Sequence, residues 1–133
     1  MTAWKSAKDR RLSMKIAISV WEGKISPVFD TASRLLVLEI EGKNEVSRFE
    51  TYFDEQAVTR RCARIRILDI DVLICGAISR TFLDMLKSSG IQVIPWVCGS
   101  AERVLDAFRR APDGNSLDAS FLMPGCTRDR SCR

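Results

Sequence analysis

The sequence from residue 71 to residue 99 decides the fold, and it reads DVLICGAISRTFLDMLKSSGIQVIPWVCG. Two apolar runs flank a helical segment that ends at Gly90. The first run ends in Cys75, and the second ends shortly before Cys98. Two strands joined by a helix of this length lie parallel in one sheet. Both cysteines are therefore expected at carboxyl-terminal strand ends, the edge at which open α/β sheets bind ligands.

The rest of the chain supplies three further strands and two further helices. Their order, β-β-β-α-β-α-β-α, predicts an α/β fold of three layers: a five-stranded mixed sheet in the order 3-2-1-4-5 with helices on both faces. This arrangement is ribonuclease H-like, and it predicts a crevice between the first and fourth strands. The predicted strands are Met14–Val20, Arg34–Ile40, Glu45–Phe53, Asp71–Cys75 and Ile91–Trp96, and the predicted helices run from an Asp54 N-cap to about Asp69, over Ser79–Ser89, and from a Ser100 cap to about Ala111.

Length and charge indicate one domain with two polar ends. The chain has 133 residues and a net charge of +4, and segment 1–13 carries four basic residues against one acid. We interpret 1–13 as a polar extension, 14–111 as the α/β domain and 112–133 as a linker with a basic, cysteine-containing tail. No apolar run approaches the roughly 20 residues of a membrane span, and no secretory signal is evident. We therefore expect a cytoplasmic protein.

The reactive residues exclude several classes of enzyme. The chain has five cysteines without a C-x-x-C pair and no histidine. Free thiols or metal ligands are expected in a reducing compartment, and hydrolases built on a Cys–His or Ser–His pair are excluded. A nuclease of this fold needs carboxylates on the first and fourth strands. Lys15–Val20 has none, and Asp71 stands at the wrong end of its strand.

Cys75 and Cys98 are the candidate metal ligands. Either could instead be a buried core residue, as free cysteines often are. Cys98 precedes a predicted helix start, which favours a thiolate. Two thiols do not complete a zinc or iron–sulfur site, so a cluster would need other donors, a second subunit, or backbone amides. Gly76 and Gly99 would let such amides approach an anionic cluster closely.

The remaining candidates are weaker. Cys62 lies on the apolar face of its helix and is expected in the core, whereas Cys126 and Cys132 lie in the basic tail without a recognisable spacing. The long loop 21–30 could be functional or could simply cover the sheet edge. The arginines on the first predicted helix indicate a solvated face, and nucleic-acid binding is not expected. These arginines are Arg60, Arg61, Arg64 and Arg66.

Four segments together resemble the dinitrogenase iron–molybdenum cofactor-binding family, which includes NifX-like proteins and the cofactor-binding domain of some NifB proteins. The resemblance covers about residues 14–111, and the segment Phe121–Cys126 is similar to the tail of one subgroup. It implies a ribonuclease H-like domain that carries a metal–sulfur cluster and catalyses no reaction. The four segments are Met14–Ile18, Ser26–Asp30, Asp71–Ser79 and Gly90–Pro95.

The leading hypothesis is a non-enzymatic protein that binds, stores or transfers an iron–sulfur or iron–molybdenum-type cluster in cofactor biosynthesis. Cluster donor and recipient proteins, and a second copy of the chain, are the expected partners. The alternatives are a thiol-based redox or metal-sensing domain and a plain protein-interaction module. The predicted metal ligands are Cys75 and Cys98, and the predicted cofactor-binding residues are Trp21, Ser26, Phe29, Gly76, Ser79 and Gly99. In this hypothesis Trp21 to Phe29 form a wall that shields the cluster, and the hydroxyls of Ser26 and Ser79 are candidate donors to cluster sulfur.

Overall fold

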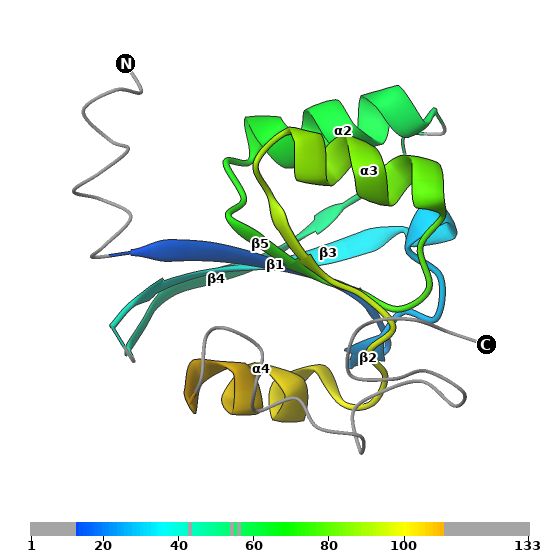
Figure 1. Ribbon diagram of the computed structural model, residues 1–133. Helices are drawn as coiled ribbons and strands as arrows, with labels where there is room; N and C mark the ends of the chain where they lie inside the picture. The colour runs from blue at the N-terminus through cyan, green and yellow to red at the C-terminus, as the bar shows by residue number, and fades with distance from the viewer. Residues whose placement is uncertain (1–12, 43, 54, 56, 111–133) are drawn as a thin grey trace.

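The computed structural model describes residues 13–42, 44–53, 55 and 57–110 (Figure 1). Several predicted features lie outside these residues. They are the extension 1–13 except for its last residue, the Asp54 N-cap, and the segment 112–133 with Cys126 and Cys132. The strands are β1 (Met14–Trp21), β2 (Lys24–Ile25), β3 (Arg34–Glu41), β4 (Asn44–Tyr52), β5 (Val72–Ile74) and β6 (Gln92–Ile94), and the helices are η1 (Phe29–Thr31), α2 (Val58–Ile67), α3 (Arg80–Ser88) and α4 (Ala101–Arg110).

The sheet is mixed and has six strands, where five were predicted. The main path runs β4-β3-β1-β5-β6, and the two-residue strand β2 pairs antiparallel with β1 off this path. β1 is parallel to β5, and β5 is parallel to β6, whereas β3 and β4 are antiparallel to their neighbours. The prediction missed β2 because two residues give no periodicity.

Helices cover both faces of the sheet, as predicted: α2 and α3 on one face and α4 on the other (Figure 1). Successive side chains of a strand point to opposite faces. In β1, Ile16 and Ile18 therefore enter the core on the α4 side, and Ala17 enters the core on the α2–α3 side. This double burial explains why the strand is apolar throughout.

Helix α2 begins later than the sequence predicts. Its first residue is Val58, and the preceding Ala57 makes no side-chain capping hydrogen bond. Its apolar positions nevertheless face the core, because Cys62 and Ile65 are buried against β5 and α3 side chains. The prediction that Cys62 is a core residue is confirmed. Burial also raises the pKa of this thiol.

Candidate functional site

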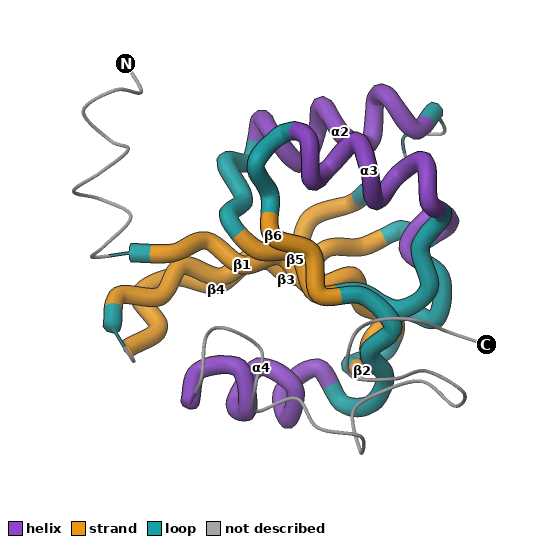
Figure 2. Tube along the Cα trace, viewed as in Figure 1, coloured by secondary structure: helices purple, strands orange, loops and turns teal. Residues whose placement is uncertain are grey.

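The carboxyl ends of β1, β5 and β6 bring three loops together at one edge of the sheet. Figure 2 shows the loops after β5 and β6 at the same end as β2. The Ile25 N–H donates to the Gly99 carbonyl at 2.9 Å, and the Ala101 N–H donates to the Gly23 carbonyl at 2.9 Å. The Trp96 N–H donates to the Gly76 carbonyl at 2.9 Å. The structure therefore joins the loops that carry the predicted site residues.

Segment Ser26–Asp30 and the loop after β5 hold each other by backbone hydrogen bonds. The Ala77 N–H donates to the Pro27 carbonyl at 2.8 Å, and the Phe29 N–H donates to the Ala77 carbonyl at 2.7 Å. A Cβ atom on Gly76 would lie 2.5 Å from the carbonyl oxygens of Ser26 and Pro27. Glycine is therefore required at position 76, because the backbone of another segment approaches it closely. This contact joins two of the segments on which the family resemblance rests, Ser26–Asp30 and Asp71–Ser79.

Side chains strengthen the same junction. The Asp30 carboxylate accepts a hydrogen bond from the Ser79 N–H at 2.9 Å, across 49 residues of chain. The Ser79 hydroxyl in turn accepts from the Phe82 N–H at 3.3 Å and caps α3. Ser79 therefore acts as a helix cap in the structure. Its predicted contact with cluster sulfur remains a prediction.

Arg61 anchors the junction from the side of α2. Its guanidinium donates to the carbonyls of Phe29 at 3.3 Å and Ala32 at 3.0 Å, and it lies 4.4 Å from the centre of the Phe53 ring. Arg61 is buried, whereas Arg60 is exposed. The predicted solvated face is therefore wrong for Arg61, because burial is tolerated when carbonyl oxygens and an aromatic ring replace water.

Cys75 is not available at this edge. The residue has no solvent exposure and lies in the core on the α2–α3 side. Burial, with a smaller contribution from Asp30, raises the pKa of its thiol far above the ordinary value. A cysteine that ligates a metal must be a thiolate that the metal can reach. The predicted role of Cys75 as a soft donor is therefore corrected to that of a core residue.

Cys98 lies in a different setting. It is partly exposed. The residues beside it have unusual backbones: Trp96 has a φ of +65° and Gly99 a φ of +111°. A Cβ atom on Gly99 would meet no heavy atom within 4 Å, so the space beside it is open. Left-handed backbone at a bulky residue is costly and tends to persist at functional sites.

Helix α4 begins directly after this loop, and its first turn is capped. The Ser100 hydroxyl accepts from the Arg103 N–H at 3.4 Å. This agrees with the predicted cap, and it places the Cys98 loop at the amino end of a helix, where anions are favoured. The roles of Cys98 as a metal ligand and of Gly99 in cofactor binding remain predictions.

The predicted wall of loop 21–30 is divided between surface and core. Trp21 is 55% exposed, and Val28 is also exposed. Phe29 is fully buried, with its ring 5.2 Å from that of Phe53 and 4.8 Å from that of Phe82. The predicted shielding role of Phe29 is therefore wrong. Ser26 is also buried, and its N–H donates to the Ser19 carbonyl at 2.9 Å.

Sequence reasoning missed Ser19. The residue is fully buried near the end of β1, and its hydroxyl has no hydrogen-bond partner among the described groups. Ser19 follows Ile18 in β1, and Cys75 follows Ile74 at the end of β5. Because Ile18 pairs with Ile74, Ser19 and Cys75 occupy corresponding positions along neighbouring strands. A serine within an apolar strand was the one available signal, because buried hydroxyls normally have partners.

The described side chains do not form a complete metal site. Among the residues that the structure describes, no group of three or more histidine, cysteine or acidic side chains could hold a metal ion. Any cluster at the edge would therefore rely on few protein donors from this region. The donor set allows a cargo site of the kind predicted from the sequence, in which amides and a single thiol contribute.

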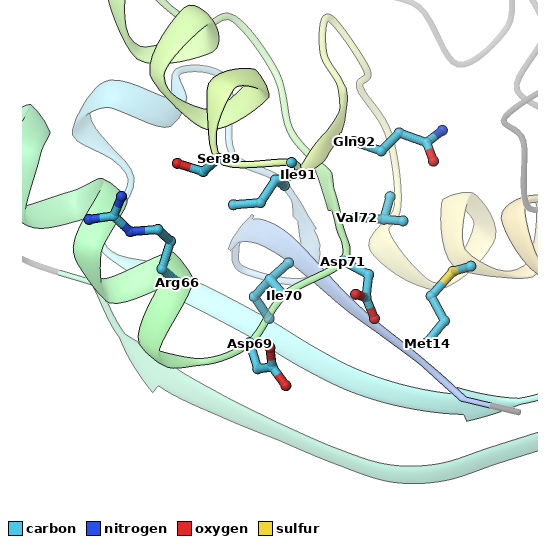
Figure 3. Close-up of a pocket in the computed structure, with 10 residues that line it drawn as sticks. Met14, Arg66, Asp69, Ile70, Asp71, Val72, Ser89, Ile91 and Gln92 are labelled. Carbon is cyan, nitrogen blue, oxygen red and sulfur yellow. The ribbon is translucent and has the colours of Figure 1, made fainter. Parts of the chain in front are cut away.

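A cavity of about 390 Å³ lies at the opposite end of the sheet, where β5 and β6 begin (Figure 3). Asp71 lines it, and its carboxylate accepts from the Lys15 N–H at 2.9 Å. The Lys15 ammonium donates to the Leu68 carbonyl at 3.5 Å. Asp71 therefore joins the starts of β1 and β5, in agreement with its position at the strand entrance.

A further cavity of about 280 Å³ adjoins the site on the α4 face of the sheet. It lies between the β1–β2 turn, the start of α4 and strand β4, which contribute Gly23, Ala101 and Arg48.

None of the described helices is long and apolar enough to cross a membrane.

The family model described as dinitrogenase iron-molybdenum cofactor matches residues 13–111. The chain belongs to this family. The matched region spans all described strands and helices, including both loops of the candidate site. No curated protein sequence matches the chain.

Solved structures share the fold at low sequence identity. The crystal structure of PH0822 has a TM-score of 0.69 and 20% identity, over 73% of this chain and 89% of that one. The crystal structure of MJ0327 from Methanocaldococcus jannaschii, described as a candidate dinitrogenase, has a TM-score of 0.63 and 22% identity over 74% and 90%. The NMR structure of TM1290 from Thermotoga, described as a candidate NifB protein, has a TM-score of 0.56 and 18% identity over 74% and 89%.

Proposed function

We propose that the chain binds an iron–sulfur or iron–molybdenum-type cluster as cargo and transfers it between proteins without catalysing a reaction. Family membership supports cofactor binding. The observation that carries the proposal is the Cys98 loop: a partly exposed thiol lies between two left-handed residues and just before a helix. We infer a ribonuclease H-like fold from the order of the main strands, and a cytoplasmic location remains a prediction.

The residues divide into two roles under this proposal. Cys98 is the soft donor, Gly99 presents backbone amide to an anionic cluster, and Trp21 lies exposed on the hairpin that is hydrogen-bonded to the same loop. Cys75, Gly76 and Ser79 hold the neighbouring loop in place. Few protein donors suit a carrier, because cargo must also leave.

The test is anaerobic reconstitution of the full chain with ferrous iron, sulfide and thiomolybdate, followed by elemental analysis and visible spectroscopy. Wild-type protein is expected to retain stoichiometric metal with charge-transfer bands. Cys98→Ser is expected to lose most of the bound metal. Cys75→Ala and Cys62→Ala serve as matched controls and are expected to retain it, because both thiols are buried.

Loss of metal in Cys75→Ala with retention in Cys98→Ser would overturn this assignment of donors. A protein that binds no metal under any of these conditions would overturn the carrier function. Reversible oxidation of Cys98 in that metal-free protein would then support the alternative, a thiol-based sensor.

A further inference from the structure

Strand β4 is an edge of the sheet with exposed apolar side chains. It ends the main path of the sheet and, among the described strands, pairs only with β3. Three of its large side chains are exposed: Val46 by 50%, Phe49 by 47% and Tyr52 by 67%. Edge strands with exposed apolar residues readily pair with another strand. This edge is separate from the Cys98 loop, and its use does not depend on the proposed function.

The hydrogen bonds between β3 and β4 determine which β4 residues direct their backbone groups to the outer side. The Phe53 N–H donates to the Ser33 carbonyl at 2.8 Å, one position beyond the last residue pair of the two strands. Inward and outward backbone groups alternate along an antiparallel strand. Arg48, Glu50 and Tyr52 therefore direct their N–H and C=O groups away from β3. The Tyr52 carbonyl already accepts from the Arg64 guanidinium at 3.3 Å, so pairing with a further strand would use Arg48 and Glu50.

The sequence of β4 is complementary to itself in one antiparallel register. When a two-fold axis passes through Phe49, Arg48 of each copy lies opposite Glu50 of the other, and the two Phe49 residues lie opposite each other. Ser47 then meets Thr51. The outward groups of Arg48 and Glu50 form the hydrogen-bonded pairs, and Phe49 occupies the non-hydrogen-bonded position, where side chains are closest.

The neighbouring registers are unfavourable. A shift by two residues places Arg48 opposite Arg48, or Glu50 opposite Glu50, and like charges directly opposite each other are destabilising. A shift by one residue sets outward backbone groups against inward ones and removes the hydrogen bonds. The pairing of opposite charges and the alternation of outward backbone groups therefore both favour the register centred on Phe49.

We infer that this chain forms a two-fold symmetric dimer in which β4 pairs antiparallel with β4 of a second copy, centred on Phe49. The same edge is used by both copies, so the assembly closes at two chains. The paired surface is short, and we therefore expect a weak, concentration-dependent dimer. A β-bulge between β3 and β4, opposite Glu39 and Ile40, ends the regular edge near Val46.

Sedimentation velocity of the full chain over a range of concentrations tests the inference. Wild-type protein is expected to shift from monomer to dimer. Glu50→Arg places two arginines opposite each other across the axis and is expected to weaken the dimer about tenfold or more. Asp84→Arg makes the same charge change on an exposed position of α3 and is expected to leave the dimer unchanged.

Mixing two variants gives a sharper result. Glu50→Arg and Arg48→Glu each repel themselves, but together they restore both opposite-charge pairs. The mixture is therefore expected to form a heterodimer that neither variant forms alone. Arg48 also contacts Glu45 and Glu102 within the chain, so circular dichroism must confirm that this variant folds. Glu50→Pro removes an outward N–H without breaking the β3 ladder and is expected to be monomeric.

Three results would overturn the dimer: a wild-type chain that stays monomeric at every concentration, a dimer that persists in both Glu50→Arg and Glu50→Pro, or a dimer that Asp84→Arg weakens as strongly as Glu50→Arg. Each readout is independent of metal loading. Failure here therefore leaves the carrier function intact, and failure of metal binding leaves the dimer intact.

Discussion

The loops after β5 and β6 follow similar strands but differ in how far their cysteines are buried. Both follow parallel strands that are in register, with Ile74 paired to Ile94. The first loop places Cys75 in the core, whereas the second places Cys98 at the surface. The reason is their neighbours: β5 lies between β1 and β6, and segment Ser26–Asp30 is bonded to its loop. A place near a carboxyl-terminal strand end is therefore not sufficient to expose a side chain at this edge.

Backbone hydrogen bonds hold both loops, because the Gly99 carbonyl accepts from Ile25 and the Pro27 carbonyl accepts from Ala77. The Cys75 loop differs in what lies beyond these bonds: segment Ser26–Asp30 covers it, and the buried Arg61 holds that segment through the Phe29 carbonyl. The Cys98 loop continues into α4, whose Glu102 contacts Arg48 of β4 at the surface. The Cys75 loop is thus the more buried of the two, and the Cys98 loop is the more exposed.

Thiol alkylation should separate the two loops most strongly. In native protein, iodoacetamide is expected to modify Cys98 at least about 1,000 times faster than Cys75, because a fully buried thiol reacts only after unfolding. Mass spectrometry of peptides over time gives both rates. Cys62 is the buried control. Comparable rates for Cys75 and Cys98 would show that the β5 loop opens readily and does not protect Cys75 from solvent.

Gly76→Ala should destabilise the β5 loop by forcing it away from the backbone of Ser26 and Pro27. The added Cβ meets two backbone oxygens at 2.5 Å, and backbone cannot move aside cheaply. We expect a loss of about 3 kcal/mol of unfolding free energy, measured by urea denaturation. Gly99→Ala is the matched change in the other loop: it meets no atom but strains a left-handed residue, so about 1 kcal/mol is expected. Equal losses would contradict the assignment of close packing to one loop alone.

Arg61→Ala should loosen the same support from the side of α2. The change leaves the Phe29 and Ala32 carbonyls without this donor and removes packing over Phe53. A loss of about 2 kcal/mol of unfolding free energy is expected. Arg60→Ala, at an exposed neighbouring position, should change stability by less than about 0.5 kcal/mol. Similar effects of the two changes would show that burial of Arg61 contributes little.

Acid should affect the α4 side selectively. The hydrogen bond from Arg48, with charge from Arg48 and Arg109, holds the pKa of Glu45 below its ordinary value of 4.5. Glu45 therefore contributes stability that is fully present above the pKa of an unfolded glutamate, and this stability is lost as the pH falls through the lower, folded pKa.

The expected size is a few tenths of a kcal/mol, because the pair is largely solvated. Glu45→Gln should flatten this part of the curve of unfolding free energy between neutral pH and acid. Hydrogen exchange should show earlier loss of protection in α4 than in α3. A variant whose acid dependence matches wild type would assign the effect to other carboxylates.

Sequence patterns predicted the sheet better than they predicted the site. The main strands carry strong periodicity or continuous apolar runs, so their existence and order followed from local chemistry. Strand β2 and η1 were missed because they have two and three residues, too few to show a periodicity. Hydrogen bonds to Gly99 and Ala77, distant in sequence, then hold them in place. Such bonds leave no trace in the composition of a short segment.

At the site, identical residue types have different fates that only the assembled fold decides. Cys75 and Cys98 were both predicted as metal ligands, and Arg60 and Arg61 were both predicted on a solvated helix face. In each pair one member is buried by a segment far away in sequence. Gly76 was predicted to let a cluster approach its backbone amide, whereas the structure fills the space beside it with protein backbone from Ser26 and Pro27.

The hydrogen bond between Asp30 and Ser79 has a consequence for the order of folding. It closes a loop of 49 residues, and closing long loops costs chain entropy that local contacts do not. We expect β1, β3 and β4 to assemble early as neighbouring hairpin strands, and the edge that bears Cys98 to be completed last. A nascent chain on the ribosome would then lack the binding edge until α4 has emerged, so only finished molecules could accept cargo.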